Sequence, residues 1–170
     1  PDIVAIKGGV VVFFENKDFT LEAAKMEHGI NCLAYSFTEK DRVKIEVAKL
    51  KKIGMKEGHL VGELQRGKNI KFKGKTIKAK DYTYKIKGKK ITFILDTYIN
   101  NNCYKIAKDS DLLVSECTYS NEHEKEAKEK KHLTAKMAAT IAKKAKVKRL
   151  ILTHFSQRYK DTKEIEKEAK

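Results

Sequence analysis

Residues 91–97 of this chain read Ile-Thr-Phe-Ile-Leu-Asp-Thr, an apolar run that ends on a carboxylate. Two further apolar runs also end on polar residues, since Leu-Leu-Val precedes Ser-Glu116 and Leu-Ile-Leu-Thr precedes His154. The stretch before Gly29 likewise ends in Met-Glu-His28. Short runs of this kind are typical of buried strands in an α/β sheet, which collects polar side chains in one crevice at the carboxyl ends of its strands. We therefore expect Asp96, Glu116, His154 and His28 to lie close together, although any one of them alone also fits a strand-end carboxylate or a hydrogen-bonded histidine.

The pattern along the chain alternates strands with helices after residue 85 and is less regular before it. We expect strands at residues 3–6, 10–15, 19–27, 32–37, 85–96, 112–115 and 150–154, helices at residues 102–108 and 132–146, and an exposed helix at residues 161–170. Residues 41–75 contain one short helix around Leu50 and then a loop-rich stretch punctuated by glycines. The charged segment around His123 is expected to be solvated.

Charge limits the kinds of partner. Lys and Arg number 38 against 23 Asp and Glu, which gives a net charge of +15 and a sequence pI near 9.6. A length of 170 residues is sufficient for one domain with a real core. A polyanion such as nucleic acid is the expected partner, and the alternative is a charged surface with ion-pair networks, as in thermophiles.

The three cysteines, Cys32, Cys103 and Cys117, are well separated and form no Cys-X-X-Cys pair. A disulfide framework and a cysteine zinc site are therefore not expected. The expected location of the protein is a reducing cytoplasm. No stretch approaches the roughly 18 apolar residues of a membrane span, so no membrane partner is expected.

Five strings of residues, spread over nearly the whole chain, resemble a known family. They are Glu27-His28-Gly-Ile-Asn-Cys-Leu-Ala-Tyr-Ser-Phe37, Asp96-Thr97, Ser115-Glu116-Cys-Thr118, Lys-His132-Leu-Thr134-Ala-Lys-Met-Ala-Ala and Leu-Ile-Leu-Thr-His154-Phe-Ser-Gln-Arg158-Tyr. They occur in the order found in ribonuclease Z, the tRNA 3′-processing endonuclease of the metallo-β-lactamase superfamily. The resemblance implies an α/β fold that is part of an αββα sandwich, with a mixed sheet flanked by helices.

The resemblance also implies a metal site of two Zn²⁺ ions. It assigns His28 and His154 as one imidazole ligand to each ion and Asp96 as the bridging carboxylate. Such ions clamp the attacking and leaving oxygens of a phosphodiester and lower the pKa of a bound water, and zinc accepts imidazole and carboxylate ligands. The alternatives are a histidine packed at the turn before Gly29 and an aspartate that caps a helix.

Glu116 and His132 are expected to form a catalytic pair, in which a carboxylate fixes the tautomer of an imidazole that acts as proton donor. In the family this pair protonates the departing ribose 3′-oxygen. The chain departs from the family's His-Glu-Ala-Thr and His-Ser-Thr strings at Ser115 and Leu133, which puts surrounding contacts in doubt but not the pair itself. The alternative is a structural ion pair at a helix N-terminus.

Residues 41–75 hold 11 Lys and Arg against four Asp and Glu, a surplus of seven. A basic excursion between strands suits a phosphate backbone, and this one resembles the flexible arm with which ribonuclease Z holds the body of tRNA. The candidate substrate-binding residues are Arg42, Lys44, Lys49, Lys51, Lys52, Lys56, Arg66, Lys68 and, in the last string, Arg158. A solvated lysine-rich loop without a partner is the alternative.

The family's His-X-His-X-Asp-His motif, which provides most of its metal ligands, has no counterpart among the five histidines here. We therefore expect residues 1–170 to be the C-terminal part of a longer ribonuclease Z, one that cuts tRNA precursors 3′ of the discriminator base only with its N-terminal half. A sheet face left uncovered is expected to favour a homodimer. The alternatives are a tRNA-binding fragment without chemistry and another metallo-β-lactamase-type hydrolase. His59 and His123 receive no role.

Overall fold

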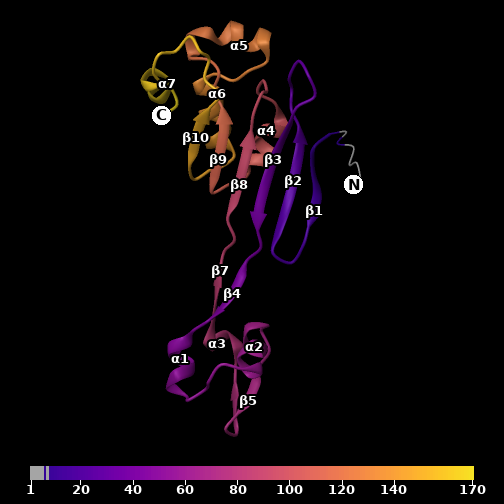
Figure 1. Ribbon diagram of the computed structural model, residues 1–170, viewed down its shortest axis with the longest axis vertical. Helices are drawn as coiled ribbons and strands as arrows, with labels where there is room; N and C mark the ends of the chain where they lie inside the picture. Colours follow the sequence, from indigo (N-terminus) through magenta and orange to yellow (C-terminus); the bar gives the residue numbers. More distant parts are fainter. Residues whose placement is uncertain (1–5, 7) are drawn as a thin grey trace. The chain divides into compact units, whose positions relative to one another are not determined.

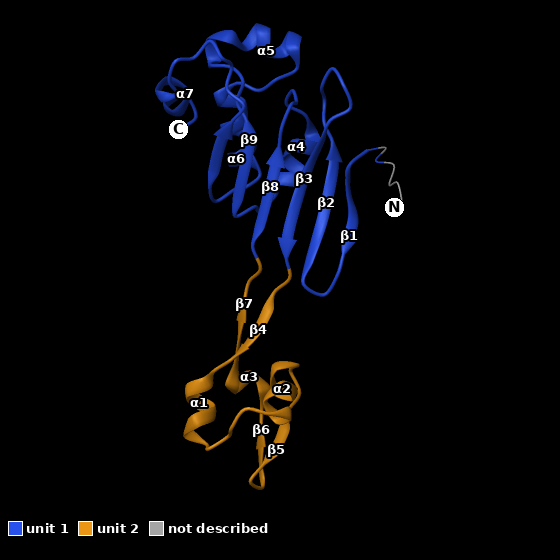
Figure 2. Cartoon of the chain, viewed as in Figure 1, with its two compact units in different colours: residues 1–39, 89–170 blue, residues 40–88 orange. Residues whose placement is uncertain are grey.

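The computed structural model describes Ile6 and residues 8–170 (Figure 1). The chain forms two compact units: one contains residues 1–39 and 89–170, and the other contains residues 40–88 (Figure 2). The strand expected at residues 3–6 lies outside the described residues, apart from Ile6. Within the described part of the chain, no helix is long and apolar enough to cross a membrane.

The first unit is built on a six-stranded mixed sheet in the order β1-β2-β3-β8-β9-β10. Its strands are β1 (Val10–Glu15), β2 (Phe19–Lys25), β3 (Leu33–Glu39), β8 (Lys90–Ile94), β9 (Leu112–Glu116) and β10 (Leu150–Thr153). The first four strands pair antiparallel, whereas β8, β9 and β10 pair parallel. The predicted mixed α/β sheet is therefore confirmed, and its parallel part contains the three apolar runs from which the prediction began.

Two helices cover one face of this sheet. They are α4 (Asn101–Ala107) and α6 (Ala135–Lys144), which pack on the strands through a core of small and branched side chains. Ile94, Ile106, Leu113 and Ile141 are fully buried in it. Burial of this face holds the parallel strands, and hence their carboxyl ends, in a fixed register.

The opposite face of the sheet is apolar and exposed. Tyr35, Phe93, Val114 and Ile151 are register partners on four successive strands, so they form one row across the sheet. Tyr35, Phe93 and Ile151 are 46%, 44% and 44% exposed, whereas Ala34, on the helix-covered face, is fully buried. A row of large exposed apolar residues is typical of a face that packs against another polypeptide.

The second unit corrects the prediction for residues 41–75, because it is folded and not loop-rich. It contains β4 (Arg42–Ile45), α1 (Val47–Lys52), α2 (His59–Gln65), β5 (Ile70–Phe72), β6 (Lys75–Ile77), α3 (Ala79–Tyr82) and β7 (Thr83–Ile86). Leu50, Met55, Leu64, Ile70 and Ile77 form its core. The helices α1, α2 and α3 have only six, seven and four residues, which is too short for a clear helical period.

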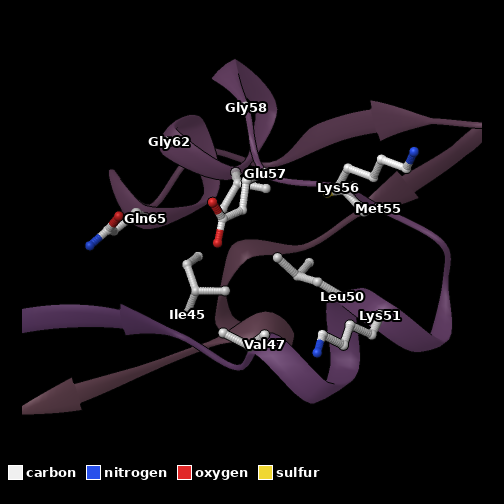
Figure 3. A pocket seen from close by; sticks show the side chains of 11 residues that line it. Ile45, Val47, Leu50, Lys51, Met55, Lys56, Glu57, Gly58, Gly62 and Gln65 are labelled. Atoms are coloured by element: carbon white, nitrogen blue, oxygen red, sulfur yellow. The ribbon is translucent and has the colours of Figure 1, made fainter.

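A pocket of about 620 Å³ opens beside this core. Ile45 and Leu50 lie on one side of it and Glu57 faces them (Figure 3).

The single strand expected at residues 85–96 is two strands, because β7 ends at Ile86 in this unit and β8 begins at Lys90 in the other.

Three features near the C-terminus also differ from prediction. The helix expected at residues 132–146 begins at Ala135, because the side chain of Thr134 caps it by accepting a hydrogen bond from the Met137 amide. The charged segment around His123, expected to be solvated, forms η1 (Asn121–His123) and α5 (Glu124–Lys130). The helix expected to be exposed at residues 161–170 is α7 (Lys163–Glu168), which is partly buried. Its Ile165 is buried beside Cys117 and Ala135.

Candidate metal and acid–base site

The side chains predicted to meet at the carboxyl ends of the parallel strands do meet there. Asp96 follows β8, Glu116 ends β9 and His154 follows β10. Asp96 and His154 have φ values of 44° and 59°, a left-handed backbone conformation that is uncommon outside glycine. Such conformations persist where surrounding structure enforces them, and they cluster at functional sites.

Asp96, His132 and His154 form a group able to hold a metal ion, since each offers one ligand atom and these atoms lie within 4.8 Å of one another. Asp96 Oδ1 lies 3.1 Å from His154 Nε2. This oxygen is nevertheless buried without a hydrogen-bond partner, because the pair is not oriented for a hydrogen bond. A buried carboxylate oxygen that faces an imidazole nitrogen without a shared proton suits a cation between them, and this donor set fits zinc.

Glu116 is a fully buried carboxylate whose oxygens accept several hydrogen bonds. The amides of Thr97 and Leu133 donate to it at 2.6 and 3.0 Å, and the Thr118 hydroxyl donates at 2.8 Å. His132 Nδ1 lies 3.0 Å from Oε1. The predicted pairing of Glu116 with His132 is therefore present, and the Leu133 contact is made by the backbone, so it does not require the family's serine side chain.

His28, predicted as a metal ligand, lies beside this group but is not one of the three residues that define it. Its Nδ1 is 3.0 Å from the carbonyl oxygen of Lys131, which can only accept, so Nδ1 carries the proton and Nε2 is unprotonated in the neutral ring. The His28 and His132 ring centroids are 4.9 Å apart, and the His132 and His154 centroids are 5.4 Å apart. The structure thus brings together all three histidines named from the sequence.

Two threonines of the site were not assigned a role from the sequence. Thr97 accepts a hydrogen bond from the Glu27 amide at 3.0 Å and thereby holds the segment that carries His28. Thr118 lies among Glu116, His132 and His154. A threonine after an apolar run is too common to indicate such a role; the signal is visible only in the tertiary contacts.

Arg158, predicted to bind substrate, is engaged within the protein. Its guanidinium donates two hydrogen bonds to Glu126, at 2.9 and 2.8 Å, and lies 5.1 Å from the ring centroid of Tyr119. These hydrogen bonds lower the pKa of Glu126 to about 2. His123, which received no role, lies 2.9 Å from the Ser120 hydroxyl and 3.2 Å from that of Tyr159, so it is part of a packed polar cluster.

The other basic residues predicted to bind tRNA belong to the second unit. Residues 40–88 contain 16 Lys and Arg against five Asp and Glu, a surplus of 11 out of the chain's net charge of +15. Arg66 and Lys68 are paired with Glu63 and lower its pKa to about 2, while Lys49 donates to the carbonyl of Asp81. His59, 81% exposed, lies 3.7 Å from Glu63.

Comparison with known proteins places this arrangement. No protein-family model matches the chain. It is 42% identical over 152 residues to ribonuclease Z of Protochlamydia amoebophila, a match that covers 89% of the chain and 49% of that protein. It is 40% identical over 163 residues to ribonuclease Z of Chlamydia caviae, covering 96% of the chain and 52% of the relative. The chain therefore spans about half the length of the curated relatives it matches.

Solved structures agree. The match to the crystal structure of the short form of human tRNase Z covers 90% of this chain and 42% of the tRNase Z chain, with a TM-score of 0.55 and 27% sequence identity. The match to a metallo-β-lactamase fold protein from Bacillus subtilis covers 94% of this chain and 45% of the Bacillus chain, with a TM-score of 0.58 and 18% sequence identity. At this low identity the match supports the fold alone. With sequence identity near 40% over most of its length and with this fold, the chain is similar to about half of a ribonuclease Z.

Proposed function

We propose that the chain supplies part of the active site of a zinc-dependent endoribonuclease that removes 3′ trailers from tRNA precursors, with the cut 3′ of the discriminator base. The observation that supports this most directly is the Asp96–His154 pair, which lies beside the buried Glu116 and its partner His132. A cation site next to a positioned imidazole is the combination that phosphodiester hydrolysis needs. The relatives' names, ribonuclease Z and tRNase Z, supply the substrate class.

In this proposal the residues of the chain divide the work. Asp96 and His154 hold a zinc ion, and His28 serves the second of two; when bound, the ions activate water and offset the charge on the phosphate. Glu116 accepts a hydrogen bond from Nδ1–H of His132 and stabilises the imidazolium form, so Nε2 is the atom that donates a proton to the departing ribose oxygen. The three cysteines are free, which suits a reducing cytoplasm as the place of action.

We further propose that a second polypeptide segment, the family's His-X-His-X-Asp-His half, completes the site. The chain spans about half of its relatives' length, and the group around Asp96 offers ligands for one ion at most. The exposed row of Tyr35, Phe93 and Ile151 is a surface for that half. A second copy of the chain is expected to occupy the row when that half is absent, which gives a homodimer.

Purified alone, the 170-residue chain is expected to bind Zn²⁺ weakly and to leave tRNA precursor uncut, whereas mixing it with the His-X-His-X-Asp-His half restores both. Elemental analysis measures bound zinc, and gel electrophoresis measures cleavage. Phe93→Glu is expected to prevent zinc uptake on mixing because it places a charge in the apolar row, whereas Val47→Glu, at a 55% exposed position of the second unit, is the matched control that leaves zinc uptake intact. Robust zinc-dependent cleavage by the chain alone contradicts the proposal of a missing half.

The second unit is proposed to be the tRNA-binding arm, and removing it is expected to weaken tRNA binding while sparing hydrolysis of a small phosphodiester. The Glu39 amide donates to the Lys89 carbonyl at 2.9 Å, so an Asn-Gly turn can replace residues 40–88 without opening the sheet. Binding titrations at several salt concentrations measure the effect. The slope of log affinity against log salt is expected to become shallower by roughly 0.7–0.9 for every phosphate group that the protein no longer neutralises.

Charge reversal separates charge from folding in the same experiment. Glutamate at the exposed Lys51, Lys52 and Lys56 is expected to reproduce most of the loss, whereas glutamate at the exposed Lys105, Lys143 and Lys146 of the first unit is the matched control. Hydrolysis of a nitrophenyl phosphodiester by the reconstituted protein shows that the site is intact. Unchanged tRNA affinity after removal of residues 40–88 identifies the unit as a solvated lysine-rich segment without a partner.

A further inference from the structure

Thr118 occupies a position from which its hydroxyl contacts three of the residues at the candidate site. Its Oγ1 lies 2.8 Å from Glu116 Oε2, 2.9 Å from His154 Nδ1 and 3.3 Å from His132 Nδ1. The residue is only 7% exposed, so water competes little for these contacts. No role was assigned to it from the sequence or from the metal group.

Backbone pairing beyond the strand ends fixes this position. The Cys117 amide donates to the Thr153 carbonyl at 2.8 Å, and the Ser156 amide donates to the Thr118 carbonyl at 3.1 Å. These bonds extend the β9–β10 contact past the last residue of each strand, so Thr118 and His154 are held side by side. The backbone therefore fixes the position of the Thr118 hydroxyl next to these three residues.

A hydroxyl has one proton, and the contacts of Thr118 determine where it goes. The buried Glu116 carboxylate can only accept, so the Thr118 proton is donated to Oε2; the opposite orientation places two acceptor oxygens 2.8 Å apart without a proton between them. With its proton used, Oγ1 can only accept from His154, whose Nδ1 must then carry a proton. In the neutral ring this leaves Nε2 as an unprotonated nitrogen.

That nitrogen is the atom that faces Asp96. His154 Nε2 lies 3.1 Å from Asp96 Oδ1, and this oxygen is buried without a hydrogen-bond partner. We propose that Thr118 is a positioning residue whose hydroxyl holds His154 in the Nδ1–H tautomer and so keeps its Nε2 lone pair directed at the cation site next to Asp96. Metal-binding histidines are commonly held in this way through their other ring nitrogen.

The inference rests on the proposed metal site, but its first test does not. In the metal-free chain, ¹⁵N–¹H correlation spectra of the histidine rings are expected to show His154 as the Nδ1–H tautomer. Thr118→Val removes the acceptor at nearly constant volume, so Nδ1–H loses its partner and the population of the Nε2–H tautomer is expected to rise. Thr118→Ser keeps the hydroxyl and is expected to keep the tautomer.

Zinc titration supplies the second readout, with Zn²⁺ alone as the probe. Thr118→Val is expected to lower the affinity roughly 10–100-fold, the usual effect of removing the hydrogen-bond partner of a metal-binding histidine, and Thr118→Ser is expected to restore it. Thr92→Val is the matched control: Thr92 is also buried, and its hydroxyl contacts Ser110 and the Ile106 carbonyl instead of the site. It is expected to leave both readouts unchanged.

The outcomes separate this inference from the proposed function. An Nε2–H tautomer in the unmodified chain overturns the role of Thr118, and so does a Val variant with unchanged tautomer and zinc affinity. If Thr118→Val does not fold, the unmodified chain and Thr118→Ser still decide the tautomer. Expected tautomers in a chain that binds no zinc, even when its other half is added, support the positioning role and contradict the zinc enzyme.

Discussion

Replacing Asp96 with asparagine is expected to abolish both metal binding and cleavage of tRNA precursor in the reconstituted protein. Asp96 supplies the one carboxylate in the group with His132 and His154. In the proposed two-zinc site, loss of this charge removes the anion that offsets the repulsion between the two cations. Asparagine is the better replacement, because it tolerates the left-handed backbone at φ 44°, whereas alanine adds strain of roughly 1–2 kcal/mol there.

Elemental analysis of zinc and gel assays of cleavage measure the result, and thermal unfolding without metal shows whether the fold is intact. Asp109→Asn is the matched control, because Asp109 also has a positive φ, of 56°, but belongs to no metal-binding group among the described residues. It is expected to leave zinc content and cleavage unchanged. An Asp96→Asn protein that keeps its metal and its full turnover excludes Asp96 as a ligand.

The parallel strands and the residues at their ends were predictable from the sequence because the signals there are local. Each of the apolar runs before Asp96, Glu116 and His154 is long enough for a strand and too short for a helix, and the rule that ligands gather at carboxyl ends then brings their polar residues together. The pairing of Glu116 with His132 followed from the family resemblance. The structure contains both arrangements.

The second unit was not predictable in the same way. Its core side chains, such as Leu50, Leu64 and Ile77, come from short helices and from a hairpin whose two strands have three residues each. No helical or strand period therefore extends over enough residues to be recognised. Glycines that were interpreted as loop signals take specific positions. Gly74, with φ 74°, lies in the turn between β5 and β6.

The hydrogen bonds of Thr118 were not predictable either. They depend on the backbone contacts that bring residues 117–118 beside residues 153–156, far apart in the chain. The same applies to His132, which was expected inside a helix but precedes it. Thr134 ends the loop by capping α6, and this leaves the His132 side chain free to reach Glu116.

Replacing His132 with alanine is expected to slow cleavage of tRNA precursor by roughly 10²–10⁴-fold, the usual contribution of a positioned general acid. Zinc content is expected to stay unchanged, because His132 donates a proton in this proposal and does not bind the metal. The structure makes the measurement sharper, since His132 also lies within the group of possible ligands formed with Asp96 and His154. A loss of zinc together with activity identifies His132 as a ligand.

The leaving group provides the control for that experiment. A nitrophenolate departs without needing a proton, whereas a ribose 3′-oxygen is a poor leaving group that needs one. His132→Ala is therefore expected to hydrolyse a nitrophenyl phosphodiester at close to the original rate while tRNA cleavage falls. If His132 holds the metal, both substrates lose activity together. Because Glu116 holds Nδ1 of His132 at 3.0 Å, Glu116→Gln is expected to show the same selectivity for the poor leaving group.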